Sequence, residues 1–166
     1  MPSEEVFTSP KYDGVNGIVY SARPLVYSGV LIDNFSFEFK AGKIINIQAE
    51  TGQEILENMI STDDGSYYLG EVALVDYDSP ISNTNIIFYE TLYDENASCH
   101  LAIGDSFPTC LENGEKMTRE ELKEHGLNQS LVHTDFMIGT SDLKIVGTTL
   151  DGKELVVFEN GNFVLE

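Results

Sequence analysis

Alternating apolar and polar residues mark the first half of the chain as rich in strands. Phe35, Phe37 and Phe39 are separated by single polar residues, which is the two-residue period of a strand with one buried face. The Ala-Gly pair at residues 41–42 predicts a turn, and residues 43–49 predict the returning strand of a hairpin.

Two shorter runs, residues 17–20 and 25–27, precede this hairpin and also predict strands. After the hairpin the period changes, because the apolar residues of segment 51–60 recur at helical spacing. Thr51 and Glu54 have the spacing of a capping box. We therefore expect a helix over this segment with Thr51 as its N-cap.

The middle of the chain predicts three more strands. Apolar runs at residues 67–75, 98–104 and 131–138 are typical of this element. Segment 85–93 is compatible with either a helix or a strand, because its apolar residues follow neither period clearly.

A short helix and a meander complete the predicted elements. Residues 118–125 predict a charged helix, with Thr118 as the first residue of a capping box. Residues 143–150 and 154–158 predict two strands that pair around the Asp-Gly turn at residues 151–152.

The composition is that of a folded chain with an unusual charge. The sequence has 9 lysines and arginines against 28 acids, for a formal net charge of −19. Leu, Ile, Val and Phe make up 49 of the 166 residues, well above the roughly 20% below which disorder is expected. The pattern and the composition together predict one β-rich α+β domain over residues 1–166, with a mixed or antiparallel sheet and a few short helices.

The charge excludes several classes of partner. Nucleic acids and anionic lipids are bound through lysine and arginine, so neither is expected here. No run of 18 apolar residues is present to span a membrane, and the first residues lack the pattern of a signal peptide. Cys99 and Cys110 are too few for a disulfide framework and predict reduced thiols in a cytoplasmic protein. A negative surface suits cations instead, either metal ions or a ligand that carries an amine.

Acids or imidazoles interrupt three of the predicted strands where the pattern favours an apolar residue. These positions are Glu71, His100 and the pair His133 and Asp135. A buried carboxylate without a partner is costly, so such groups normally meet a cation, a metal or a hydrogen-bond network. Each position alone also has an ordinary explanation, as a solvent-facing acid or a hydrogen-bonded core histidine.

The pair on the third of these strands points most directly to a metal. His133 and Asp135 are two residues apart, so their side chains leave the same face of a strand. A nitrogen and a carboxylate together suit Zn²⁺, Co²⁺, Mn²⁺ or Fe²⁺ better than Ca²⁺. A composite metal site follows only if the separate segments converge in space. The two acids at Glu4 and Glu5 are, by themselves, typical of a solvated terminus.

Long segments of the chain resemble a known family. Four segments carry the likeness: PSEEVFTSP, YYLGEVALV, DSPISNTNIIFYETLYDENASCHLAIG and SLVHTDFMIG. Through them the sequence resembles the thermophilic metallo-aminopeptidases, the group of aminopeptidases T, S and PepS. The match runs in order over nearly the whole length of the chain. Members of this family are much longer. The resemblance therefore implies that residues 1–166 are the C-terminal catalytic, metal-bearing part, without the family's N-terminal domain.

The resemblance implies a dinuclear metal site. Carried over residue by residue, it implies five ligands, with Glu71 bridging two divalent ions: Glu5, Glu71, His100, His133 and Asp135. The ions would be zinc, cobalt or manganese, and four of the five positions are those that interrupt the strand pattern.

Two further positions concern catalysis. The family has an active-site tyrosine seven residues after the first histidine ligand, where this chain has Phe107. Either the protein is slow, another group replaces the hydroxyl, or the hydroxyl is dispensable. A general base is also needed to move a proton from water to the leaving amine. Glu4 is the candidate because it adjoins Glu5.

The function that the resemblance implies is removal of the N-terminal residue from peptides. The partners would be peptides with a free N-terminus, and family members form homodimers. We expect the isolated piece to be poorly active, because the missing domain would help to shape the substrate cavity. The alternative is a non-catalytic acidic metal-binding module or an assembly domain that has lost activity, and Phe107 is the only hint of the assembly domain.

Overall fold

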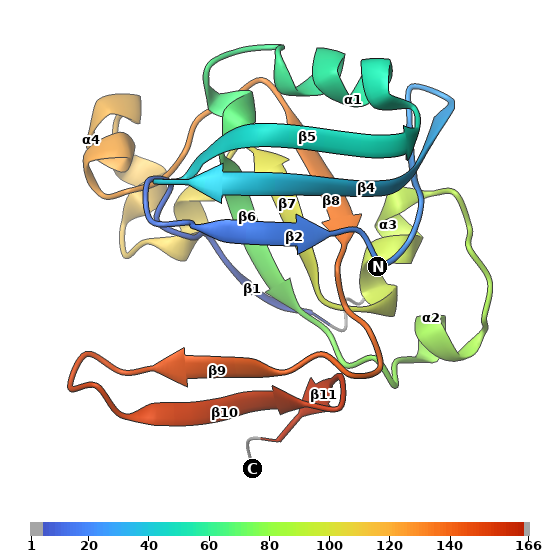
Figure 1. Ribbon diagram of the computed structural model, residues 1–166. Coiled ribbons are helices and arrows are strands. Elements are labelled where there is room, and N and C mark those ends of the chain that lie inside the picture. Colours follow the sequence, from blue (N-terminus) through green and yellow to red (C-terminus); the bar gives the residue numbers. More distant parts are fainter. Residues whose placement is uncertain (1–4, 165–166) are drawn as a thin grey trace.

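The computed structural model describes residues 5–164 of the chain. Most of its regular structure consists of strands (Figure 1). In chain order they are β1 (Val6–Thr8), β2 (Gly17–Tyr20), β3 (Leu25–Tyr27), β4 (Val30–Lys40), β5 (Lys43–Thr51), β6 (Leu69–Leu74), β7 (His100–Gly104), β8 (His133–Met137), β9 (Ile145–Thr148), β10 (Glu154–Glu159) and β11 (Asn162–Phe163).

The helices are short. They are α1 (Gln53–Ile60), α2 (Pro80–Asn83), α3 (Thr91–Asp94) and α4 (Arg119–Glu124), with 3₁₀ turns at Gly65–Tyr67, Glu95–Ala97, Pro108–Cys110 and Gly114–Lys116. None of the helices within residues 5–164 has the length and apolar character needed to cross a membrane.

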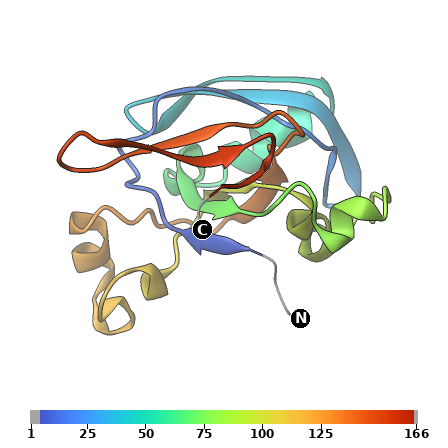
Figure 2. The same cartoon turned by 90° about the horizontal axis from the view of Figure 1, so that it is seen from below.

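Three sheets organise the molecule, and every strand pair among the described residues is antiparallel. The first sheet has the order β1-β6-β7-β8, the second joins β2, β4, β3 and β5, and the third has the order β11-β10-β9. In Figure 1 the third sheet lies below the two larger ones, and Figure 2 looks at the molecule from that side. The prediction of a β-rich α+β fold with a mixed or antiparallel sheet is confirmed, and the pairing is antiparallel.

The core lies where the first two sheets and α1 meet. Phe35 and Phe37, from the alternating strand, contact Phe136 of β8, with ring centroids 5.8 and 5.2 Å apart. All three rings are buried, together with Leu56 of α1 and Ile103 of β7. The apolar face that the alternation predicts for β4 is therefore the face that packs against the first sheet.

The start of α1 differs from the prediction. Thr51 is the last residue of β5, paired with Asp33, and Gly52 is the N-cap with a φ of 79° and no side-chain cap. A side chain at Gly52 would also meet the carbonyl oxygen of Leu31 at 2.8 Å. The long hairpin therefore continues through Thr51, and glycine makes the reversal into the helix.

The capping box on the later helix is confirmed. The Thr118 hydroxyl accepts from the Glu121 backbone N–H, and the Glu121 carboxylate accepts from the Thr118 backbone N–H. Segment 85–93 forms neither predicted element over most of its length. Positive φ angles at Asn85 and Tyr89 interrupt it, and only its end enters α3.

Candidate metal centre

A bulge in β6 turns Glu71 away from the core. Leu69 pairs with Ile103 and Glu71 pairs with the adjacent Ala102, so Gly70 is an extra residue in β6. In a regular strand Leu69 and Glu71, two residues apart, would lie on the same face. The bulge leaves Leu69 in the core cluster and places Glu71 on the opposite face. A side chain at Gly70 would lie 2.0 Å from the Asp105 carbonyl oxygen, so glycine permits this close approach.

Strand register then gathers the other polar residues on that same face. Ala102 pairs with Glu71 on one side and with Asp135 on the other, so the three form a row across the sheet. His100 lies two residues before Ala102 on β7, and His133 lies two residues before Asp135 on β8, so both share the face of this row. The small Ala102 in the middle leaves space between the carboxylates of its neighbours.

Glu5, the fifth predicted ligand, lies at the edge of the sheet. Glu5 immediately precedes β1, which pairs with β6. Its carboxylate lies 3.2 Å from Nε2 of His100. On the other side of Glu71, Nε2 of His133 lies 3.3 Å from the Glu71 carboxylate and 3.5 Å from that of Asp135.

These contacts form two groups of three potential ligands that share one residue. Glu5, Glu71 and His100 form one group, and Glu71, His133 and Asp135 form the other, each with ligand atoms within 4.8 Å of one another. The structure therefore brings together all five side chains that the sequence singled out. Glu4 lies outside the described residues.

Backbone carbonyls fix the orientation of both imidazole rings. Nδ1 of His100 lies 3.2 Å from the carbonyl oxygen of Ser98, and Nδ1 of His133 lies 2.9 Å from that of Asp105. A carbonyl oxygen only accepts, so each Nδ1 carries the proton and donates it. Each Nε2 is then directed at the carboxylates, as in histidine ligands whose second nitrogen is held by a carbonyl.

The carboxylates shift the titration of both histidines. Burial alone would lower the pKa of His133, but hydrogen bonds to Asp135 and Glu71 outweigh it and raise the pKa to about 10. Burial also opposes protonation of His100, but the hydrogen bond to Glu5, the charge of Asp135 and the Ser98 carbonyl together outweigh it, so that the pKa of His100 is also raised. The cluster therefore favours the protonated form of both imidazoles.

A cavity of about 200 Å³ opens onto this cluster and adds residues that the sequence analysis had not connected with it. Besides the five, its walls are Phe7, Leu92, Glu95 and Phe107. The Phe107 ring packs edge-on against His133, at 4.9 Å between centroids, and against Phe7, at 5.3 Å. Phe107 thus lies beside the cluster and presents an apolar ring to it.

Glu95 is the residue that the sequence analysis missed. It begins the 3₁₀ turn Glu95–Ala97 and lines the cavity. Burial, followed by the charge of Asp135, raises its pKa to about 7. Its position after a single-turn helix gave no periodic signal, and it stands in an acidic stretch that is typical of a solvated loop.

The donor set fits divalent transition metals. Three carboxylates and two imidazoles, with no lysine or arginine among the cavity's described lining residues, offer oxygen and nitrogen ligands without a competing cation. The two cysteines are free thiols outside this lining. Cys99 is buried against the backbone of Val75, where burial raises the pKa of its thiol.

The whole chain matches one protein family. The family of thermophilic metalloproteases (M29) matches residues 1–163. The chain is 56% identical over 163 residues to aminopeptidase AmpS of Bacillus subtilis (strain 168), covering 98% of this chain and 40% of that protein. It is 53% identical over 166 residues to aminopeptidase 2 of Geobacillus stearothermophilus, covering 100% of this chain and again 40% of the relative.

A solved structure agrees with the fold. Wild-type AmpT from Thermus thermophilus superposes with a TM-score of 0.92 at 40% sequence identity, covering 98% of this chain and 40% of that one. This chain thus spans about 40% of the length of the relatives that it matches.

Proposed function

Because the chain belongs to the thermophilic metalloprotease (M29) family, we propose that it is the metal-bearing part of an aminopeptidase that removes the N-terminal residue of peptides. In this proposal residues 1–166 carry the catalytic site, and the rest of the polypeptide found in the longer relatives completes the substrate cavity. The shared carboxylate between two groups of ligands is the observation that carries the proposal.

Two divalent cations would be held by the five residues of the cluster, with Glu71 contributing to both positions. When bound, such a pair supplies an acidified water and a polarised carbonyl for peptide hydrolysis. Zinc, cobalt and manganese all suit the mixture of carboxylates and imidazoles. The ligand geometry needs little rearrangement, because the carbonyls of Ser98 and Asp105 already hold the rings.

Glu95 is the described carboxylate best placed to move a proton. It lines the cavity, stands outside both groups of three ligands, and is partly buried. A carboxylate in this position can accept a proton from water and return it to the leaving amine. We therefore assign this step to Glu95, with Glu4 as the alternative that lies outside the described residues.

The rest of the cavity suits the substrate. Phe7, Leu92 and Phe107 form a partly exposed apolar wall that an apolar side chain of the peptide can contact. The acidic cluster attracts the positively charged α-amine of a peptide, and the net charge of −19 raises the local concentration of such cations. The free cysteines support a reducing, cytoplasmic location. A homodimer, expected from the family, completes the proposal and is checked by sedimentation.

Hydrolysis of leucyl-p-nitroanilide in the presence of Co²⁺ or Zn²⁺ tests the function. We expect metal-dependent release of nitroaniline, and a Glu71→Gln variant should lose more than about 10²-fold of this activity together with its bound metal. The matched control is Glu154→Gln, since Glu154 is exposed on β10. Equal activity in the two variants would reject the proposal.

The alternative, a non-catalytic acidic metal-binding or assembly domain, makes a different prediction in the same experiment. Such a protein would bind metal through the cluster and release no nitroaniline at any metal concentration. The resemblance in sequence and fold favours the enzyme, whereas Phe107 is the one feature that favours the alternative.

A further inference from the structure

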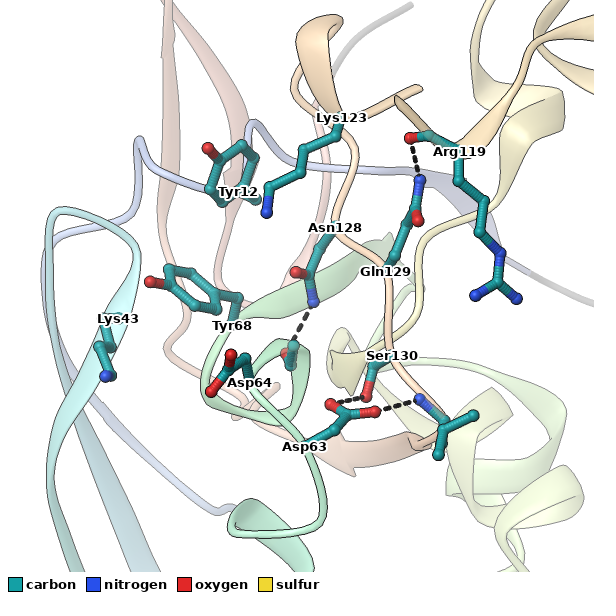
Figure 3. Close-up of a pocket in the computed structure, with 12 residues that line it drawn as sticks. Tyr12, Lys43, Asp63, Asp64, Tyr68, Arg119, Lys123, Asn128, Gln129 and Ser130 are labelled. Atoms are coloured by element: carbon teal, nitrogen blue, oxygen red, sulfur yellow. Dashed lines mark hydrogen bonds between the residues drawn. The ribbon is translucent and has the colours of Figure 1, made fainter. Parts of the chain in front are cut away.

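A second and larger cavity lies between α4, the 3₁₀ turn Gly65–Tyr67 and the β4–β5 turn. Its volume is about 710 Å³, within the range typical of sites for small molecules. Figure 3 shows the side chains around it. The lining residues are Tyr12, Lys43, Asp63, Asp64, Gly65, Tyr68, Arg119, Lys123, Asn128, Gln129, Ser130 and Leu131.

The floor of this cavity is built from closely packed backbone. The buried Asn128 donates through its amide to the carbonyl oxygens of Gly65, at 2.8 Å, and of Gly104, at 2.6 Å. A side chain at Gly65 would lie 1.9 Å from the carbonyl oxygen of Gln129, so glycine is required at this contact. The cavity is therefore a feature of packed, hydrogen-bonded backbone rather than of loose surface loops.

Basic side chains gather around the cavity in an otherwise acidic protein. Three of the nine lysines and arginines line it, and they come from separate elements: Lys43 from β5, and Arg119 and Lys123 from α4. The ion pairs found among residues 5–164 involve other bases, Lys11 and Lys144, and none of these three. In a chain with 28 acids and 9 bases, three bases gathered around one cavity make a place that suits an anion.

The ammonium groups of Lys43 and Lys123 lie near tyrosine rings, a contact that leaves their N–H groups available as hydrogen-bond donors. Nζ of Lys43 lies 4.8 Å from the Tyr67 ring centroid, and Nζ of Lys123 lies 6.0 Å from that of Tyr12. Figure 3 shows the Lys123 side chain extending toward Tyr12, while Lys43 stands on the opposite wall. Both ammonium groups thus remain free to donate to a ligand between them.

The acids of the cavity do not cancel this charge. The Asp63 carboxylate accepts from the Ser130 hydroxyl at 2.8 Å and from the backbone N–H groups of Leu131 at 2.6 Å and Ser66 at 2.9 Å. Burial opposes, and these hydrogen bonds together outweigh it, so that the pKa of Asp63 is lowered. Asp63 therefore stays ionised with its oxygens occupied by its own donors, so that two acids, Asp63 and Asp64, stand against three bases in the lining.

We propose that this cavity binds a small oxyanion, with Lys43, Lys123 and Arg119 as the groups that recognise it. The oxyanion chemistry is shared by two sources, inorganic or organic phosphate and small dicarboxylates. This site is independent of the proposed peptidase chemistry, because none of its residues lines the smaller cavity.

Amide chemical-shift titration of the metal-free protein tests the site without any need for hydrolysis. Inorganic phosphate and succinate are added separately at pH 7 and about 0.15 M ionic strength, where charges beyond about 8 Å are screened. We expect saturable shifts within residues 63–68 and 128–131 for at least one anion. Shifts with phosphate alone identify a phosphate site, and shifts with succinate alone identify a carboxylate site.

Paired lysine variants make the test specific. The double variant Lys43→Met and Lys123→Met should weaken binding about tenfold or more, because both charged donors are lost. The double variant Lys144→Met and Lys153→Met removes the same charge from the β9–β10 ribbon and should bind as the parent does. Thermal unfolding confirms that both variants fold. No saturable shift with either anion, equal weakening in both variants, or shifts confined to residues around His100 would overturn the proposal.

Discussion

The two cavities of this molecule are built in opposite ways. The smaller one gathers four carboxylates and two imidazoles, four of these six groups from neighbouring strands on one sheet face, and no lysine or arginine of residues 5–164 lines it. The larger one gathers bases from a hairpin and a helix around a floor of backbone. In each cavity the side chains leave one sign of charge unbalanced.

The difference shows how a strongly acidic chain can keep two ligand chemistries apart. Strand register fixes the acidic cluster. Residues two apart on one strand share a face, and so do the residues that pair with them on the adjacent antiparallel strand, so their side chains are held at ligand spacing. The basic cavity depends on the placement of α4 and the β4–β5 turn, which carry long flexible side chains. We therefore expect the acidic cavity to be the more rigid of the two.

The largest effect that separates the two cavities is pH-dependent stability. His133 has a folded-state pKa of about 10, above the ordinary value of 6.5, so its stabilising contribution is complete below pH 6.5 and is lost as the pH rises through about 10. The pKa of Glu95 is raised from 4.5 to about 7, so ionisation of Glu95 lowers the free energy of unfolding as the pH rises from 4.5 to about 7. We expect the metal-free protein to lose on the order of 3 kcal/mol of unfolding free energy between pH 6.5 and 10.

Chemical denaturation across this range measures that loss, and saturating Zn²⁺ should reverse its slope because metal binds the deprotonated imidazole. A His133→Asn variant should flatten the metal-free profile. A His125→Gln variant, which changes the C-cap of α4 and leaves the cluster intact, should retain the parent slope. An unchanged profile in His133→Asn would contradict the assignment.

A smaller effect is expected from Phe107→Tyr. The ring already packs against His133, so the added hydroxyl would project from the cavity wall without repacking the core. One hydrogen-bond donor to a developing oxyanion is typically worth about 10²–10³ in rate. We expect kcat for leucyl-p-nitroanilide to rise about tenfold to 10²-fold with KM little changed. An unchanged kcat would mean that the hydroxyl is dispensable in this protein.

The smallest expected effect compares two neighbouring acids of the larger cavity. Asp63→Asn replaces one of the two acceptor oxygens with an NH₂ donor, so either the Leu131 N–H or the Ser66 and Ser130 donors lose their acceptor, and we expect a loss of about 1–2 kcal/mol of unfolding free energy. Asp64→Asn, which changes an exposed carboxylate, should stay within about 0.5 kcal/mol of the parent. Urea denaturation of the two variants measures both values, and equal losses would show that the Asp63 hydrogen bonds are not special.

Much of the candidate metal site could be predicted, because polar residues at apolar positions of a strand are easy to recognise in the sequence. A strand of alternating or buried residues makes a carboxylate or an imidazole stand out, which is how Glu71, His100, His133 and Asp135 were recognised. Their convergence could not be predicted from the pattern alone, since it depends on the bulge at Gly70 and on pairing between distant segments. Glu5 was recognised only through the family resemblance.

Other features gave no readable signal in the sequence. Glu95 lies in a short turn with no period, and the bases around the larger cavity are separated by up to 80 positions, Lys43 to Lys123. The local sequence pattern also gave a wrong helix start where a tertiary contact competed with it. Thr51 has the spacing of an N-cap, but its pairing with Asp33 keeps it in β5 and moves the cap to Gly52.

The central claim is that five side chains, sharing Glu71, hold two divalent cations. Anomalous diffraction from a crystal soaked in Zn²⁺ or Co²⁺ tests it most directly. We predict two anomalous peaks, one among Glu5, Glu71 and His100 and the other among Glu71, His133 and Asp135, with both absent in the Glu71→Gln variant. Metal peaks confined to surface acids elsewhere, with none beside either histidine, would contradict the account.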